Sequence, residues 1–240
     1  MTDVTGSDVP QGREVKWYAG GVATTETVTV VAADVTAEGF ALTGTAEYGS
    51  VIATVDGVPT AIVEYKTDKS APATEADGCK FVGYTGIAKG DVVVVHYIDI
   101  GTTTLNQVAA CLDVKFSASA DTKAATVHGQ ANKLNSVGAV ENTAELSEFY
   151  YNQNFVAMCI GDQLTDSPAA KKKTFTTKFT GVRKIGALVG KRFSAAGNVV
   201  YKWFIVGAQA TGLDGEFPTE DYYKRSMRFQ ADYLTEVDLS

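Results

Sequence analysis

Cysteine is scarce in this chain, and its distribution excludes two kinds of stabilisation. Three cysteines occur, Cys79, Cys111 and Cys159, and they lie far apart in the sequence. An odd number of widely spaced cysteines argues against a disulfide framework. No CxxC pair is present, which excludes a zinc knuckle. Cys111 and Cys159 lie in apolar runs, so we expect them to be small residues of the core.

Groups suited to catalysis are also few. The two histidines, His96 and His128, each stand alone in a strand-like segment, where a packed or surface role is the usual one. The motifs of metalloproteases, α/β-hydrolases, P-loop proteins and dinucleotide-binding proteins are absent. The acidic groups at 214–216 and 220–221 are better explained as solvated turns than as a cation site. The sequence therefore predicts a protein that is not an enzyme and needs no metal or cofactor.

Long apolar runs are missing as well. No stretch reaches the roughly 18 apolar residues that a membrane-spanning helix needs. The first residues, 1–14, are polar and acidic, without the basic start and apolar centre of a signal peptide. We therefore expect the protein to be made in a cytoplasm and to stay there, at least at first.

Basic residues are outnumbered, but only in one part of the chain. The formal net charge is −7. Residues 1–100 contain 14 acidic and 6 basic residues, whereas residues 101–240 contain 14 acidic and 15 basic residues. This asymmetry suggests two modules with different surfaces. Neither part is basic enough to indicate a protein that grips nucleic acid.

Short strand-like segments recur in the acidic part, separated by turn signals such as Asp56-Gly57 and Asp77-Gly78. Their spacing of roughly 8–12 residues predicts an immunoglobulin-like β-sandwich over residues 23–99. Residues 1–22 are then an N-terminal arm with the first strand of a second domain, which continues over residues 100–240. The predicted strands are Val15–Ala19, Thr27–Ala32, Gly39–Thr43, Ser50–Val55, Thr60–Lys66, Lys80–Thr85 and Val92–Tyr97.

The stretch Val108–Lys133 is the most distinctive of the second part. Apolar and polar residues alternate from Leu112 to Ser117, which is the period of a half-buried strand. Small polar residues predict a turn at Ala120–Thr122, and strand-like residues resume at Thr126–His128. The stretch therefore predicts a long antiparallel hairpin. Its flanks are rich in Ala, Ser and Thr, which suits an ordinary edge hairpin and a contact with a neighbouring subunit equally well.

After the hairpin, Leu134–Glu148 fits either a loop or a strand, and Glu148–Ile160 is the candidate helix, which Gly161 and Asp162 would end. Further strands are predicted over Thr174–Lys184 and Val199–Thr211.

The last predicted strand, Tyr222–Val237, alternates strictly between apolar and polar residues. This period of two places one set of side chains in a core and the other set on the surface or against a neighbouring subunit. The expected core residues are Met227, Phe229, Ala231 and Tyr233, and the expected outer residues are Arg228, Gln230 and Asp232.

Three runs of the second part resemble the major tail tube proteins of tailed viruses. They are DVKFSASADTKAATVHGQ, AELSEFYYNQNFVAMCIGD and FPTEDYYKRSMRFQADYL. The order of long hairpin, helix and aromatic terminal strand carries the resemblance more than any one residue. The fold it implies is mainly β: a tail-tube-type β-sandwich with a long hairpin and one flanking α-helix, plus the immunoglobulin-like module as an insertion on the outer wall.

The resemblance also implies a function. In that family six copies form a ring, the rings stack into a tail tube, and the tube is the conduit for genome delivery. It implies a virion tail as the location, after assembly in the host cytoplasm. The implied partners are other copies of the chain, the tape measure, tail terminator and baseplate proteins, and passing double-stranded DNA that is not bound sequence-specifically.

Together with the resemblance, the hairpin becomes the candidate for a subunit interface and a lumen wall. Its charges are balanced rather than basic, which suits a wall that DNA must pass. The alternatives are a binding or decoration protein of two β-sandwiches, adhesin-like or on a capsid surface, and an enzyme with an unrecognised site. The proposed hairpin residues are Leu112, Val114, Phe116, Ser117, Ser119, Asp121, Lys123, Thr126 and His128.

Overall fold

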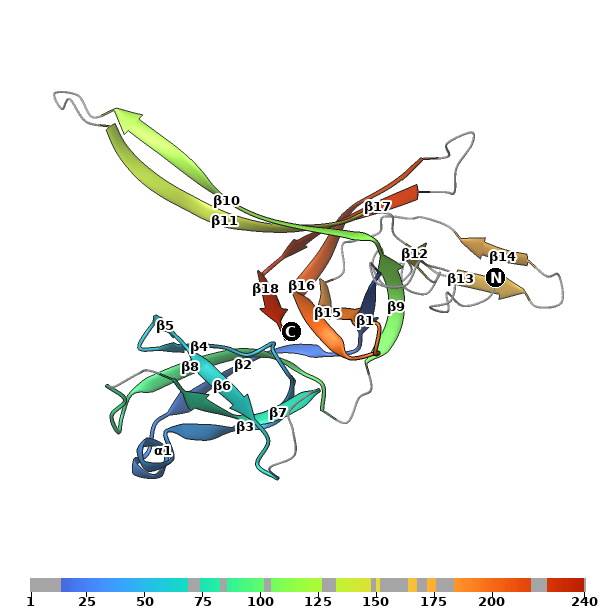
Figure 1. Cartoon of the computed structure of the whole chain (residues 1–240). Coiled ribbons are helices and arrows are strands. Elements are labelled where there is room, and N and C mark those ends of the chain that lie inside the picture. Colours follow the sequence, from blue (N-terminus) through green and yellow to red (C-terminus); the bar gives the residue numbers. More distant parts are fainter. Residues whose placement is uncertain are drawn as a thin grey trace.

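The computed structural model describes residues 14–68, 74–82, 86–101, 105–126, 133–147, 150–151, 164–167, 172–175, 184–216 and 224–239. The mainly β prediction is confirmed, since these residues form sheets of nine, seven and two strands (Figure 1). The strands pair antiparallel throughout the described ranges.

The nine-stranded sheet, called the body sheet below, has the order β10-β11-β17-β16-β15-β1-β9-β12, and β18 also pairs with β16. A separate two-stranded sheet is formed by β13 (Leu164–Ser167) and β14 (Lys172–Phe175). The strands of the body sheet are β1 (Val15–Ala19), β9 (Asn106–Cys111), β10 (Asp113–Thr126), β11 (Lys133–Ser147), β12 (Tyr150–Tyr151), β15 (Lys184–Phe193), β16 (Val199–Glu216), β17 (Lys224–Ala231) and β18 (Tyr233–Asp238).

The seven-stranded sheet, called the lateral sheet, has the order β5-β4-β8-β3-β7-β6, with β2 also paired to β8. Its strands all come from residues 22–99, so the chain enters it after β1 and leaves it before β9. That residues 23–99 form a separable immunoglobulin-like module stays a prediction. The strands are β2 (Val22–Thr29), β3 (Gly39–Glu47), β4 (Ile52–Val55), β5 (Val58–Thr60), β6 (Ile62–Tyr65), β7 (Glu75–Phe81) and β8 (Val92–Asp99).

Of two Asp-Gly pairs that predict turns in the lateral sheet, one forms a turn and the other lies within a strand. Asp56 and Gly57 join β4 to β5 with positive φ angles of 48° and 81°, the conformation of a tight two-residue hairpin turn. Asp77-Gly78, in contrast, lies inside β7. Gly78 stands there because the ring of Tyr65 on the neighbouring strand occupies the space that a side chain would need.

The helix of the described chain is not where the sequence predicts one. α1 spans Ala32–Ala37, where a strand end is predicted, and it begins where Asp34 accepts a hydrogen bond from the backbone N–H of Val31 (2.9 Å). It ends at Glu38, which has a left-handed φ of 55°. None of the helix side chains is buried, so the segment has no apolar stripe that a sequence pattern could reveal.

The predicted helix Glu148–Ile160 is wrong where it can be compared. Tyr150–Tyr151 form strand β12, which pairs with Ala110 and Ala109 of β9. The other positions of that prediction lie outside the described residues.

The body sheet curls around one core. Residues from β1, β9, β11, β15, β16 and β17 all contribute buried side chains to a single cluster, so one face of the curved sheet encloses this core (Figure 1). Trp17 lies at its centre, fully buried, and its indole N–H donates a hydrogen bond to the Sγ of Cys111 (3.0 Å). Gly190 faces this ring, and a Cβ at that position would lie only 2.9 Å from it.

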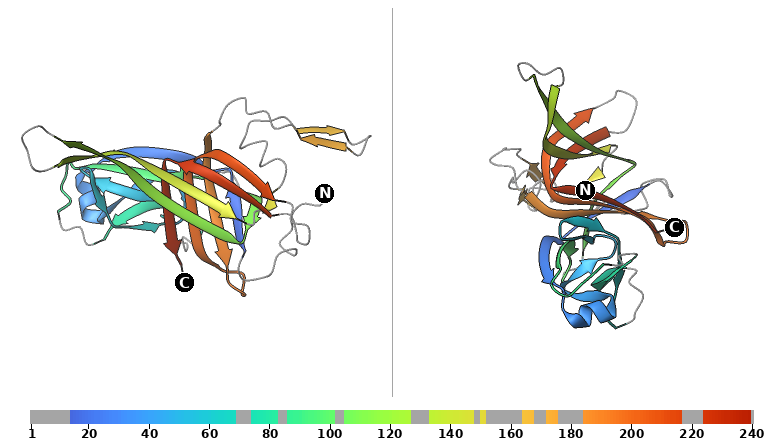
Figure 2. Two further views of the ribbon diagram at one scale, coloured as in Figure 1. Left: turned by 90° about the horizontal axis from the view of Figure 1, so that it is seen from above. Right: turned by 90° about the vertical axis from the view of Figure 1, so that its left-hand side faces the viewer.

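A second core joins the two sheets. Ile98 of β8, fully buried, packs with Ala187, Val189, Phe204 and Val206 of the body sheet. The lateral sheet therefore lies against the outer face of β15, β16 and β18, on the side of the body sheet away from the Trp17 core (Figure 2). β15 and β16 are covered on both faces, and this explains why three consecutive residues, 187–189, are all buried.

Candidate assembly interface

Strands β10 and β11, together called the ribbon, form the longest strand pair among the described residues and extend well beyond the body (Figures 1 and 2). Their register runs from Asp113 opposite Ser147 to Thr126 opposite Lys133. β11 pairs with β17 only over Asn142–Leu146. Beyond that segment, the described ribbon consists of its own two strands, and an isolated two-stranded hairpin is marginally stable in water.

The predicted turn at Ala120–Thr122 is wrong. β10 runs through this point with an irregularity in register, since Ala120 is opposite Val140 and Thr122 is opposite Val137. The residues have turn propensity but include no glycine or proline to end a strand, so the ladder absorbs them as a local irregularity. The partner strand is β11, which settles the open choice between loop and strand for Leu134–Glu148 in favour of a strand over most of its length.

The proposed hairpin residues divide into two groups. Leu112, Val114 and Phe116 are half-buried, and the last two pack against the body core. Ser117 and Ser119 are exposed. Asp121, Lys123 and Thr126 belong to the distal part of β10, and His128 lies outside the described residues. The ribbon is thus anchored by its apolar base, while Ser117 and Ser119 just beyond it are exposed.

β10 is an edge strand. Within the described chain its hydrogen-bonded neighbour is β11, and the opposite end of the body sheet is the two-residue strand β12. A strand of 14 residues at an edge presents a row of backbone donors and acceptors that can pair with another chain. Among the described strands the body sheet is therefore open, with a long edge at β10 and shorter edges at β12 and β18.

A row of charged side chains crosses the exposed face near the ribbon base. Lys115 on β10 is opposite Glu145 on β11, and Glu145 is opposite Arg228 on β17. The Nε of Arg228 lies 3.7 Å from the Oε1 of Glu145. Opposite charges in directly facing positions attract across a sheet. Each basic group of this row consequently stands beside the same carboxylate.

The terminal strand starts as the alternation predicts and then changes face. Met227 and Phe229 are fully buried and Ala231 is 9% exposed, all in the body core. Tyr233, however, packs in the second core between the sheets, next to His96, with ring centroids 6.1 Å apart. The prediction that Tyr233 shares the face of the other three is wrong.

The change of face occurs at Asp232 and Gly207, where the pairing of β16 moves from β17 to β18. Gly207 has a φ of 63°, a conformation that favours glycine. The Asp232 carboxylate lies where a side chain on Gly207 would stand. After this point Leu234, rather than Tyr233, packs against the body core.

A cluster of charges that the sequence did not single out joins the two sheets. Lys202 on β16 donates hydrogen bonds to the Oε1 of Glu47 on β3 (2.9 Å) and to the carbonyl oxygen of Tyr48 (2.7 Å). The Nζ of Lys191 on β15 lies 2.6 Å from the same Oε1. We call Glu47, Lys191 and Lys202 the joint. Its one signal in the sequence is a lysine within the apolar run 199–206.

Burial dominates the electrostatics around the joint. Lys202 is 0% exposed and Glu47 is 2% exposed. Burial lowers the pKa of Lys202, and the Glu47 carboxylate opposes that shift. Nearby, burial raises the pKa of Glu64, although its carboxylate accepts hydrogen bonds from the backbone N–H groups of Gly49 and Val51.

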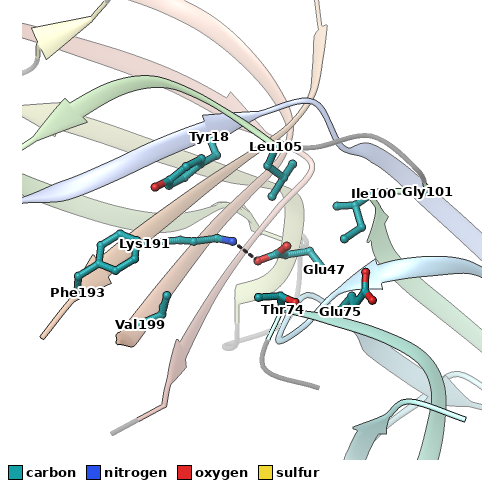
Figure 3. Close-up of a pocket in the computed structure, with 10 residues that line it drawn as sticks. All are labelled: Tyr18, Glu47, Thr74, Glu75, Ile100, Gly101, Leu105, Lys191, Phe193 and Val199. Carbon is teal, nitrogen blue, oxygen red and sulfur yellow. Dashed lines mark ion pairs between the residues drawn. The ribbon is translucent and has the colours of Figure 1, made fainter. Parts of the chain in front are cut away.

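A pocket of about 550 Å³ opens beside the joint (Figure 3). The ammonium of Lys191 points into its centre toward Glu47, and it lies 5.3 Å from the centre of the Tyr18 ring. The other lining residues come from both sheets and from the segment that connects them: Thr74, Glu75, Ile100, Gly101, Leu105, Phe193 and Val199.

The described cysteines are not suited to chemistry at a surface. Cys79 and Cys111 are free and buried, and burial raises the pKa of each thiol to about 12. Thiolates are the reactive form of cysteine, so both act as small core residues. The third cysteine, Cys159, lies outside the described residues.

The described ranges contain neither a candidate metal cluster nor a candidate membrane-spanning helix. No group of three or more His, Cys, Asp or Glu side chains there could hold a metal ion. No helix in the same ranges is long and apolar enough to cross a membrane.

The chain was compared with known proteins. No family model and no curated protein matches it. Among solved structures, it is similar to a chain of an extracellular contractile injection system, the PVC sheath-tube complex in its extended state. The two chains are 15% identical with a TM-score of 0.36, and the match covers 56% of this chain and 82% of the other.

Proposed function

We propose that this chain is a structural protein, not an enzyme, whose copies pair through the ribbon into stacked rings that form a viral tail tube. The observation that carries the proposal is strand β10, a 14-residue strand at the edge of an open sheet. The resemblance of the hairpin, the segment after it and the terminal strand to tail tube proteins supports the same reading.

The physical argument concerns the unpaired edge. A long edge strand is an aggregation hazard unless something covers it. Pairing with another copy satisfies its backbone groups. Because the long edge β10 differs from the short edges β12 and β18, contact between copies through unlike surfaces is heterologous, which generates closed rings or helical stacks. We propose six copies to a ring, as in the family that the sequence resembles.

The exposed face of the ribbon base suits a conduit for DNA. Ser117 and Ser119 are small and uncharged, and Lys115 and Arg228 flank the carboxylate of Glu145. Because phosphate contacts dominate the affinity of proteins for DNA, a wall with paired charges holds DNA weakly. In such a tail the further partners are the tape measure, tail terminator and baseplate proteins, and the particle assembles in the host cytoplasm.

The test is electron microscopy of the purified full chain together with sedimentation. We expect stacked rings. Proline removes a backbone donor, and neighbouring residues of an antiparallel strand direct their N–H groups to opposite sides. Of Ala118→Pro and Ser119→Pro, one variant should therefore lose the rings and keep its circular dichroism spectrum, while the other loses pairing within the ribbon.

Two results would contradict the proposal. A wild-type chain that stays monomeric at high concentration would favour the binding or decoration protein instead. Normal rings from both proline variants would show that β10 does not pair between copies.

A further inference from the structure

The joint connects parts of the molecule that are far apart in sequence. Glu47 belongs to the lateral sheet, whereas Lys191 and Lys202 lie on adjacent strands of the body sheet, opposite each other in register. Both ammonium groups approach the same carboxylate oxygen, at 2.6 and 2.9 Å. Lys202 also reaches the carbonyl oxygen of Tyr48, the residue after Glu47.

Because these charged groups are buried, their contact favours one orientation of the lateral sheet on the body sheet. A charge taken out of water is costly unless it is paired and hydrogen-bonded. Removal of one partner from a buried pair leaves the other uncompensated, which is strongly destabilising. Lys202 is fully buried and its described acceptors both come from β3 and the turn after it. Lys202 can donate both hydrogen bonds in one placement of the lateral sheet. Rotation or sliding of that sheet over the body sheet would break both of them.

The surroundings leave little room for a hinge. A Cβ on Gly186 of β15 would lie 2.8 Å from the carbonyl oxygen of Gly21, just before the lateral sheet begins. A Cβ on Gly49 would lie 3.3 Å from a methyl group of Val237 on β18. Ile98 adds the apolar contact described above. Besides the joint, close contacts with β15, β16 and β18 thus hold the lateral sheet against the body sheet.

We infer that Glu47 is a positioning residue that fixes the lateral sheet on the body sheet, so that residues 22–99 are a rigid part of the assembling unit and not a mobile decoration. Lys202 lies on β16, whose far half pairs with β17, and β17 pairs with β11. The orientation set at the joint is therefore transmitted along hydrogen-bonded strands to the ribbon. The part of this inference that concerns assembly rests on the proposed function, and the part that concerns rigidity does not.

The test measures orientation and assembly separately on the full chain. Residual dipolar couplings, recorded at a concentration below assembly, report whether the two sheets share one alignment frame. The variants are Glu47→Gln, Glu47→Gln with Lys202→Met, and a matched control, Glu75→Gln. Glu75 lines the same pocket but sits at its rim in a partly exposed ion pair with Lys66.

We expect wild type and Glu75→Gln to fit one common frame and to form rings. Glu47→Gln should keep the native shift dispersion of each sheet, need two frames and lose ordered rings. The double variant should regain a common frame, because methionine fills the volume of Lys202 without a charge that needs a partner, and the remaining ammonium, that of Lys191, is 13% exposed and lines the pocket, where water can solvate it. If Glu47→Gln fails to fold, a folded double variant with one frame still supports the inference.

Three outcomes would overturn it: a common frame in folded Glu47→Gln, an equal loosening in Glu75→Gln, or a double variant that needs two frames or fails to fold. Normal rings from a loosened Glu47→Gln would remove the assembly role alone. The alignment measurement needs no rings. A wild type that fails to assemble therefore refutes the proposed function, while the rigidity of the joint is still tested by the dipolar couplings.

Discussion

The middle of the body sheet and its ribbon end are built differently. In the middle, β15 and β16 are covered on both faces, and even charged groups such as Lys202 and Glu47 are buried. At the ribbon end, the apolar residues Val114 and Phe116 are half-buried, and residues 117–120 beyond them are small and exposed. The central strands are fully covered by contacts within the chain. The ribbon leaves an exposed surface and the backbone edge of β10 available to another chain.

This contrast separates stability from assembly. Substitutions near the joint and the body core should cost folding free energy, because they remove contacts within the chain. Substitutions on the ribbon should cost little in the isolated chain and act when copies meet. The three predictions below test that division, starting with the largest expected effect.

Phe229→Ala should destabilise the isolated chain by about 3–5 kcal/mol, because it empties a fully buried ring position in the body core. Phe116→Ala provides the matched comparison, since it removes the same ring from a half-buried position at the ribbon base. Its cost should be clearly smaller. Urea unfolding of both variants measures the difference. Equal losses would mean that the ribbon base contributes as much to the stability of the fold as the core does.

The strands that face water on one side are predictable from the sequence. Met227, Phe229 and Ala231 alternate with exposed residues because β17 has one dry and one wet face. The same reason makes Leu112–Ser117 recognisable as strand. β15 escapes prediction because both of its faces are buried, so the run Ala187–Val189 has no alternation to detect.

Other features depend on contacts that no local pattern contains. The strand changes face just before Tyr233, where the left-handed Gly207 on the neighbouring strand leaves room for the Asp232 carboxylate. Lys202 can be recognised in the sequence as an unusual lysine in an apolar run. Its partner Glu47, however, is 155 positions away in the sequence. The ribbon as a candidate interface was accessible from its composition, whereas the joint required the fold.

The second prediction concerns alkaline pH. Burial raises the pKa of the Cys79 and Cys111 thiols to about 12 from an ordinary 9.0, and that of the Tyr97 hydroxyl to about 12 from 10.0. In the unfolded chain these groups lose their protons first, so the folded state holds more protons above about pH 9 and stability falls as pH rises. Burial also raises the pKa of Tyr233 to about 12, which adds to this trend, whereas the lowered pKa of Lys202 opposes it.

Unfolding in urea from about pH 8 to about pH 11 measures this slope. Cys79→Ala should make it shallower, since one titrating group is gone. The groups whose raised pKa values are named here belong to the cores and not to the ribbon. The dependence of stability on pH should therefore be the same in a proline variant that folds but does not assemble. A stability that rises with pH over this range would mean that the buried thiols and hydroxyl do not control alkaline unfolding.

The smallest effect on stability is expected at the charged row of the ribbon base. Glu145→Gln should change the unfolding free energy by about 1 kcal/mol or less, because the Arg228 pair is exposed and salt screens it. The same substitution leaves Lys115 and Arg228 without the carboxylate between them. DNA should then bind the assembled tubes more tightly at low salt, and the difference should vanish as salt is added. Ser119→Ala, a neutral change on the same exposed face, is the control. A Glu145→Gln tube that holds DNA no better than this control at low salt would place the row away from the lumen, even if the ring itself assembles through β10.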